Sequence, residues 1–164
     1  MVRETIVQAR AQRDHVVSYE GELDYIASEA RLYETVETGG ELFGFWTHSG
    51  NPVIQLVTGP GARATRTSTS FFQDIEYLEE SAGHLNQKHG LQHIGSWHSH
   101  HTLGLREPSG GDIRTTRSAL PQFDLERLLL VLLNLGSPEP EIELTSFFFH
   151  NVRGPEHTAW TLLP

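Results

Sequence analysis

The chain of 164 residues contains no cysteine. Disulfide bonds, cysteine-ligated zinc or iron–sulfur sites and a cysteine nucleophile are therefore excluded, whatever the fold. Positive charge is also scarce, because 12 Lys and Arg residues stand against 21 Asp and Glu residues, and the formal net charge is −9. A nucleic acid or an anionic membrane is bound through a basic surface, so neither is an expected partner. Any metal site must use carboxylates and the ten histidines.

No segment approaches the roughly 18–20 uninterrupted apolar residues of a membrane-spanning helix. The first residues, Met-Val-Arg-Glu-Thr, also lack the apolar stretch of a signal peptide. A cytoplasmic protein is therefore expected. Domains usually contain about 100–200 residues, and 37% hydrophobic residues suffice for one core. We expect residues 1–164 to form a single domain.

Short helix and strand patterns alternate along the chain, which contains no internal repeat. Apolar residues at helical spacing predict helices over residues 20–34, 70–90 and 113–121. Ser70 and Gln73 have the spacing of a capping box at the start of the second helix, and Gly90 closes it, whereas Pro121 ends the third. Residues 59–70 are interpreted as a loop. Aliphatic, aromatic or β-branched runs predict strands over residues 42–46, 52–57, 91–97, 128–133, 142–149 and 159–163. One sheet between helices, an α/β or α+β fold, accounts for this order.

The most informative segment is His98-Ser99-His100, with Asp112 further along the chain. Side chains two residues apart on an extended strand point to the same side, so the two imidazoles can converge on one ion. Asp112 follows a Gly-Gly turn at the start of the third predicted helix, from which its carboxylate can turn back toward the histidines. Two histidines and one carboxylate suit catalytic zinc, because three protein ligands leave the fourth tetrahedral position open. A His-x-His pair alone is more often a pair of exposed or hydrogen-bonded histidines.

The neighbouring aromatic residues have simpler interpretations. His101 should point away from the histidine pair, and Trp97 should pack in the core. The seven other histidines have no ligand spacing and are interpreted as surface or packing residues.

The same residues resemble the motif of the JAMM (MPN+, JAB-domain) metalloprotease family, which is an upstream Glu, then His-x-His, a gap and Ser-x-x-Asp. His98-Ser99-His100 matches the first part, and Ser109-Gly110-Gly111-Asp112 matches the second. Residues 37–44, Glu-Thr-Gly-Gly-Glu-Leu-Phe-Gly, resemble the family's Glu-Thr-x-Gly-x-Leu-x-Gly segment. The resemblance covers residues 23–120. It has two departures: the gap before Ser109 holds eight residues instead of the usual seven, and His101 replaces a common Pro.

This resemblance implies an MPN/JAB-like fold, with a curved mixed β-sheet flanked by helices. It also implies one zinc ion, held by His98, His100 and Asp112, that activates a water molecule. By family position, Glu37 is the general base, and Ser109 donates to the oxyanion that forms when the carbonyl is attacked.

Two of these roles have competitors. Glu41 is the other candidate for the general base, because it lies four residues from Glu37, but it is also interpreted as an exposed strand residue. Only the resemblance favours Glu37 over Glu41 as the base. Glu37 is itself equally interpreted as the polar end of the first helix region. Ser109 is well placed to cap the third helix, and one hydroxyl can serve both purposes.

The family hydrolyses the bond after the C-terminal Gly-Gly of ubiquitin or ubiquitin-like proteins. By resemblance, we expect a deubiquitinase-like zinc isopeptidase that deconjugates or processes a ubiquitin-like modifier in a bacterial conjugation pathway, with antiviral defence as one context. Its partners would be the modifier, its conjugates and the activating and conjugating enzymes of the operon. The modifier tail would pair with an exposed strand edge, in the hairpin 43–57 or beside the loop 102–107. A non-catalytic MPN scaffold and a zinc hydrolase of another peptide or a small amide stay open as alternatives.

Overall fold

The computed structural model describes residues 15–101, 104–136, 142–151 and 153–164. In these residues the elements follow the order β1 (His15–Tyr19), α1 (Glu20–Leu32), β2 (Gly39–Trp46), β3 (Pro52–Val57), β4 (Thr65–Arg66), β5 (Phe71–Phe72), α2 (Ile75–His89), β6 (Gln92–Ser99), α3 (Gly110–Gln122), β7 (Arg127–Leu135), β8 (Ile142–His150), β9 (Glu156–His157) and β10 (Ala159–Leu163). No helix among them is long and apolar enough to cross a membrane.

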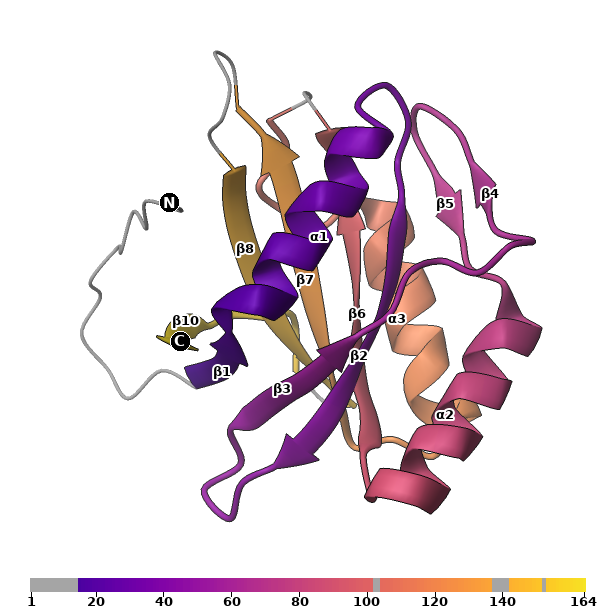
Figure 1. Cartoon of the computed structure of the whole chain (residues 1–164). Coiled ribbons are helices and arrows are strands. Elements are labelled where there is room, and N and C mark those ends of the chain that lie inside the picture. The colour runs from indigo at the N-terminus through magenta and orange to yellow at the C-terminus, as the bar shows by residue number, and fades with distance from the viewer. Residues whose placement is uncertain (1–14, 102–103, 137–141, 152) are drawn as a thin grey trace.

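One mixed sheet of eight strands organises the fold, in the order β10-β1-β3-β2-β6-β7-β8-β9. β1 pairs in parallel with β3 and β10, and β6 pairs in parallel with β7, whereas the remaining neighbours are antiparallel. The short strands β4 and β5 form a separate antiparallel pair that stands apart from the sheet (Figure 1). The mixed α and β architecture predicted from the sequence is therefore confirmed.

β7 is buried on both faces and separates two apolar clusters. Its residues 129, 131 and 133 pack in the cluster that contains the apolar face of α1. Residues 128, 130 and 132 pack on the opposite face, with Leu120 of α3. Figure 1 shows α1 across one face of the sheet and α3 behind the other. The strand has an unbroken apolar sequence because both of its faces are covered, as predicted.

α1 is positioned by an apolar stripe. Its buried residues occupy positions 23, 26, 27 and 30, the spacing of one helical face. The helix begins at Glu20, as predicted, and ends at Leu32 rather than at residue 34.

The start of α2 corrects a prediction. Asp74, not Ser70, is the N-cap, and its carboxylate accepts a hydrogen bond from the backbone N–H of Tyr77 at 3.3 Å. Ser70 stays outside the helix because Phe71–Phe72 forms β5. Gly90 ends the helix in the left-handed conformation, with φ 67°, as predicted.

Three further differences concern short elements. The segment expected to be a loop contains β4, which pairs with β5. α3 extends through Pro121, which therefore lies in its last turn instead of beyond its end. β1 and β9 were not predicted, and β9, with two residues, is too short to show a period.

Candidate metal centre

The three side chains predicted to bind a metal ion meet in one place. His98 lies in β6, His100 follows that strand, and Asp112 comes from the first turn of α3. The two Nε2 atoms of the histidines are 3.1 Å apart. Asp112 Oδ1 lies 3.3 Å from His98 Nε2, and Asp112 Oδ2 lies 3.5 Å from His100 Nε2. Both histidines are buried, at 8% and 2% exposed, so their nitrogens face each other away from bulk water.

These separations fit a single tetrahedral ion. Ligand atoms about 2.0–2.1 Å from a tetrahedral zinc ion lie about 3.3–3.4 Å from one another. The two histidine nitrogens are 3.1 Å apart, and each lies 3.3 or 3.5 Å from one of the two Asp112 oxygens, close to that value. With one ligand atom taken from each residue, all three lie within 4.8 Å of one another. A neutral imidazole can present one nitrogen lone pair to a cation, and a carboxylate oxygen only accepts, so the donor set also suits a divalent metal ion. The residues present therefore fit the predicted ion.

The start of α3 orients Asp112. Ser109 is the N-cap, and its Oγ accepts a hydrogen bond from the backbone N–H of Asp112 at 3.1 Å. In return, Asp112 Oδ2 accepts from the backbone N–H of Ser109 at 2.7 Å, which completes a capping box. The capping role of Ser109 is thus present, and the carboxylate reaches the histidines although the preceding loop is one residue longer than the family's.

The pKa values of Asp112 and His100 shift in opposite directions, as in an ion pair. Burial alone would raise the pKa of Asp112, but hydrogen bonds with His100 and His98 hold it well below the usual range of a carboxyl. Burial lowers the pKa of His100, but the hydrogen bonds with Asp112 and the Leu105 carbonyl and the charges of Asp112 and Glu37 together outweigh burial, so the pKa is raised. The metal-free site thus favours an ionised carboxylate and protonated imidazole, and a metal cation would replace the proton.

The second ring nitrogen of His100 is also held. Its Nδ1 lies 2.7 Å from the carbonyl oxygen of Leu105. A carbonyl only accepts hydrogen bonds, so Nδ1 carries a proton and Nε2 is left to bind the ion. The backbone N–H of His100 donates to the carbonyl of Leu133 in β7 at 2.8 Å. Neither carbonyl was predicted, because a backbone acceptor leaves no mark on the sequence.

Glu37 lies beside the three ligands, in the segment between α1 and β2. It is 8% exposed. Burial raises the pKa of its carboxyl, against the opposite influence of His98 and His100. Its backbone N–H donates to the carbonyl of Thr67 at 2.8 Å, whereas its carboxylate has no hydrogen-bond partner within the described part of the chain. A buried carboxylate without such a partner, near the metal-binding groups, is available to accept a proton.

Glu41, the competing carboxylate, is already paired. Its Oε2 lies 2.5 Å from His93 Nε2, and the side chain is buried in the contact between β2 and β6. The expectation that Glu41 is an exposed strand residue is therefore wrong, and His93 has a specific partner that its sequence context did not indicate.

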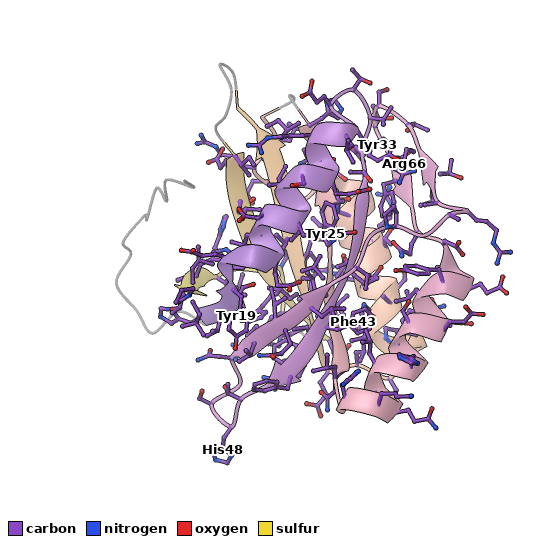
Figure 2. The ribbon with its side chains drawn as sticks, in the orientation of Figure 1. Tyr19, Tyr25, Tyr33, Phe43, His48 and Arg66 are labelled. Carbon is purple, nitrogen blue, oxygen red and sulfur yellow. The ribbon has the colours of Figure 1, made fainter. Side chains whose placement is uncertain are left out.

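The β4–β5 hairpin braces the segment that carries Glu37. Arg66 in β4 donates from Nε to Thr38 Oγ1 at 3.0 Å. The same guanidinium lies over the ring of Tyr33, 4.0 Å from its centroid (Figure 2). These contacts were not predicted, because they depend on a hairpin whose residues were assigned to a loop and to the start of the second helix.

The neighbours of the histidine pair lie as expected. Trp97 is 1% exposed and packs in the apolar cluster of α1. His101 turns toward the β4–β5 hairpin, where its Nε2 lies 2.8 Å from the carbonyl of Ser68.

The structure places the two segments expected to receive a peptide tail in different surroundings. β2 and β3, which form the hairpin 43–57, are both interior strands of the sheet, and β3 pairs with β1 through Val53 alone. Residues 102–103 of the second candidate lie outside the described residues. The remainder of that loop runs along β8, where Arg106 pairs with Glu143 at 2.9 Å.

Comparisons with known proteins agree with this geometry. The chain superposes on the solution structure of protein DSY2949 from Desulfitobacterium hafniense with a TM-score of 0.71, over 90% of this chain and 92% of that one. At 19% identity, this likeness establishes the fold alone. No protein-family model matches the chain. Over 124 residues, 73% of this chain and 75% of its relative, it is 30% identical to "Probable metalloprotease y4qB" of Sinorhizobium fredii. The chain therefore belongs to the family of that metalloprotease.

Proposed function

We propose that the protein is a JAMM-type zinc peptidase that cleaves the isopeptide or peptide bond after the C-terminal glycine of a ubiquitin-like modifier. The observation that supports it most is the cluster of His98, His100 and Asp112, with the buried carboxylate of Glu37 beside it. A zinc ion bound there would lower the pKa of a bound water molecule to about 7 and would so supply a nucleophile at neutral pH.

The protein's own groups perform the proton transfers. His100, with its proton held on Nδ1 by the Leu105 carbonyl, keeps Nε2 free for the ion. Glu37 takes a proton from the attacking water and returns it to the departing amine. Its raised pKa suits this second step, because a more basic carboxylate gives a carboxylic acid whose pKa is closer to the working pH.

Ser109 is the proposed hydrogen-bond donor to the substrate. Its Oγ accepts a hydrogen bond from Asp112 N–H, so its own hydroxyl proton can donate to another group. The side chain is exposed at the start of α3, beside the metal-binding carboxylate. We assign it the donor role toward the carbonyl oxygen, where negative charge increases as the bond is attacked.

The substrate part of this proposal rests on the resemblance of the motifs. A modifier with an extended Gly-Gly tail, its conjugates and the activating and conjugating enzymes of a bacterial pathway are the proposed partners, and antiviral defence is a proposed context.

Mass measurement of cleavage products tests the function. The purified protein is incubated with candidate modifiers that carry a C-terminal extension, in the presence and absence of a zinc chelator. Cleavage after the terminal glycine that stops with chelator and returns with added zinc is expected. Cleavage that persists in chelator would refute the metal mechanism. Bound metal without cleavage of any modifier would favour a hydrolase of another peptide or small amide, and a protein that binds no metal would favour the scaffold alternative.

A further inference from the structure

β7 contains one buried polar side chain, which directly follows its aliphatic run. Asn134 follows six consecutive aliphatic residues, 128–133, and is 3% exposed. Burial of an amide is unfavourable unless it is hydrogen-bonded, by roughly 1–3 kcal/mol on the scale of protein mutations. An aliphatic residue would suit the two-sided burial of this strand better. The presence of Asn134 thus calls for a specific contact, and none of the proposed catalytic steps uses it.

That contact is with the carbonyl that holds a metal ligand. Asn134 Nδ2 donates to the carbonyl oxygen of Leu105 at 3.0 Å. The same oxygen lies 2.7 Å from His100 Nδ1. A carbonyl oxygen has two lone pairs, so it can accept both bonds together. Asn134 Oδ1 is buried and has no hydrogen-bond partner among the described residues, so the amide makes its hydrogen bond through Nδ2.

The backbone at Leu105 needs this support. The Leu105 side chain is 49% exposed and does not anchor the segment in the core. Gly104 precedes it in the left-handed conformation, with φ 66°, which few other residues adopt readily. The next residue, Arg106, is held by contacts with exposed side chains of β8. The hydrogen bond from Asn134 therefore connects this surface segment to the rigid interior of the sheet.

We propose that Asn134 is a positioning residue of the metal centre, which fixes the Leu105 carbonyl and, through it, the imidazole of His100. This inference rests on the metal site of the proposed function. Without Asn134, the carbonyl is free to turn toward water, and His100 loses the acceptor that keeps its proton on Nδ1. Mutation of a group that hydrogen-bonds to a metal-binding histidine typically weakens metal affinity about 10–100-fold. Asn134 acts one bond further away, so we expect a loss of about 10-fold.

Zinc itself is the probe. Asn134→Ala and Asn134→Leu both remove the donor, and Leu keeps a branched side chain that avoids a cavity. Zinc affinity of the purified full chain is measured by competition with a chromogenic chelator, and cobalt absorption reports the coordination geometry. Thermal unfolding of the metal-free forms reports stability separately. The matched control is Ser146→Ala, because Ser146 is 2% exposed in the adjacent strand β8 and its hydroxyl bonds to Thr158, not to the Leu105 segment.

We expect both Asn134 variants to bind zinc about 10-fold more weakly, with an altered cobalt spectrum, while Ser146→Ala keeps the affinity of the unaltered protein. Equal zinc affinity in a folded Asn134 variant would overturn the inference and leave the proposed function intact. An unaltered protein that binds no zinc would overturn both. If neither variant folds, nitrogen-15 spectra of the unaltered, zinc-loaded protein decide the question. A His100 Nδ1–H protected from exchange supports the proposal, and rapid exchange contradicts it.

Discussion

Thr38 and Ser99 hold each other through two hydrogen bonds. The backbone N–H of Thr38 donates to Ser99 Oγ at 3.0 Å, and the backbone N–H of Ser99 donates to the carbonyl of Thr38 at 2.8 Å. Both residues are completely buried. Since Thr38 follows Glu37 and Ser99 separates the two histidines, this pair joins the proposed base to the metal ligands as one rigid unit.

Ser99→Ala should therefore destabilise the fold. It leaves the buried N–H of Thr38 without its side-chain acceptor, at a cost of about 1–3 kcal/mol. Thermal unfolding should show a midpoint lower by about 3–10 °C. Ser118→Ala is the control, because that hydroxyl is on the exposed side of α3 and bonds within the helix. An equal, small change in both variants would contradict the bridging role of Ser99.

Zinc should stabilise the protein, because its proposed ligands come from β6 and α3. A ligand that binds only the folded state adds about 2.7 kcal/mol at 100 times its dissociation constant. For a chain of this size, we expect a melting temperature about 5–10 °C higher with zinc than with a chelator. His98→Ala should abolish the gain, whereas His48→Ala, at the exposed tip of the β2–β3 hairpin (Figure 2), should keep it. An equal gain in both variants would exclude His98 as a ligand.

Glu37→Gln should reduce cleavage about 10²–10⁴-fold and leave zinc affinity unchanged, since only the proton transfer is lost. Activity of the unaltered protein should rise with pH through an inflection above 4.5, the ordinary pKa of a Glu carboxyl, because burial raises the pKa of Glu37. A mutant with full activity would show that another group is the base.

The same substitution should raise the stability of the metal-free protein at neutral pH. Because the pKa of Glu37 is raised in the folded state, the contribution of Glu37 to the free energy of unfolding is present below pH 4.5 and is lost as the pH rises through the folded pKa. Gln cannot ionise and does not incur that loss. Thermal unfolding at pH 7 checks the direction, and a lower melting temperature for Glu37→Gln would contradict it.

Zinc binding should release protons and weaken in acid. The raised pKa of His100 means that its proton must leave before Nε2 can bind the ion. In the metal-free protein, the contribution of His100 to stability is present below pH 6.5 and is lost as the pH rises through its folded pKa. That of Asp112 is present above pH 3.8 and is lost as the pH falls through its lower folded pKa.

His100 and Asp112 therefore both contribute fully to the stability of the metal-free protein between pH 3.8 and 6.5. In this range protons compete best with zinc for the cluster. Calorimetry in two buffers with different ionisation enthalpies measures the protons released. An affinity that stays constant from about pH 5 to 8 would conflict with a raised His100 pKa.

Gly39→Ala and Gly83→Ala should change stability in opposite directions. A Cβ at Gly39 would lie 2.4 Å from the backbone oxygen of Trp97 and 2.7 Å from Phe71 Cε1, so the strands must separate, at about 1–3 kcal/mol. At Gly83, inside α2, nothing lies within 4 Å of the new Cβ, and Ala should stabilise the helix by about 0.5–1 kcal/mol. Denaturant unfolding compares the two, and a stable Gly39→Ala would show that the contact of Phe71 with β2 can relax.

Local patterns account for what the sequence predicted correctly. The two-residue spacing of His98 and His100 and the cap at Ser109 are properties of a few consecutive residues, so the proximity of the three side chains could be predicted without knowledge of the fold. The aliphatic run in β7 likewise reports its own burial.

Contacts between distant segments were not predictable in the same way. Arg66 reaches Thr38 only because β4 pairs with β5, and Asn134 reaches Leu105 only because β7 lies beside the loop after β6. The sequence indicated the importance of Asn134 only by placing this polar residue directly after an aliphatic run. The wrong start of α2 has a different cause, because Ser70 and Asp74 are both good caps and the pairing of β5 decided between them.

The parallel pairing of β1 with β10 also bears on how the chain is synthesised. His15 pairs with Ala159, and Tyr19 pairs with Leu163, so β1 is made long before its partner. Contacts of such large sequence separation form slowly. Until β10 leaves the ribosome, the outer edge of β1 is a row of unpaired backbone groups, which is the kind of surface that invites aggregation. The pairing of β10 with β1 therefore covers this edge only late in synthesis.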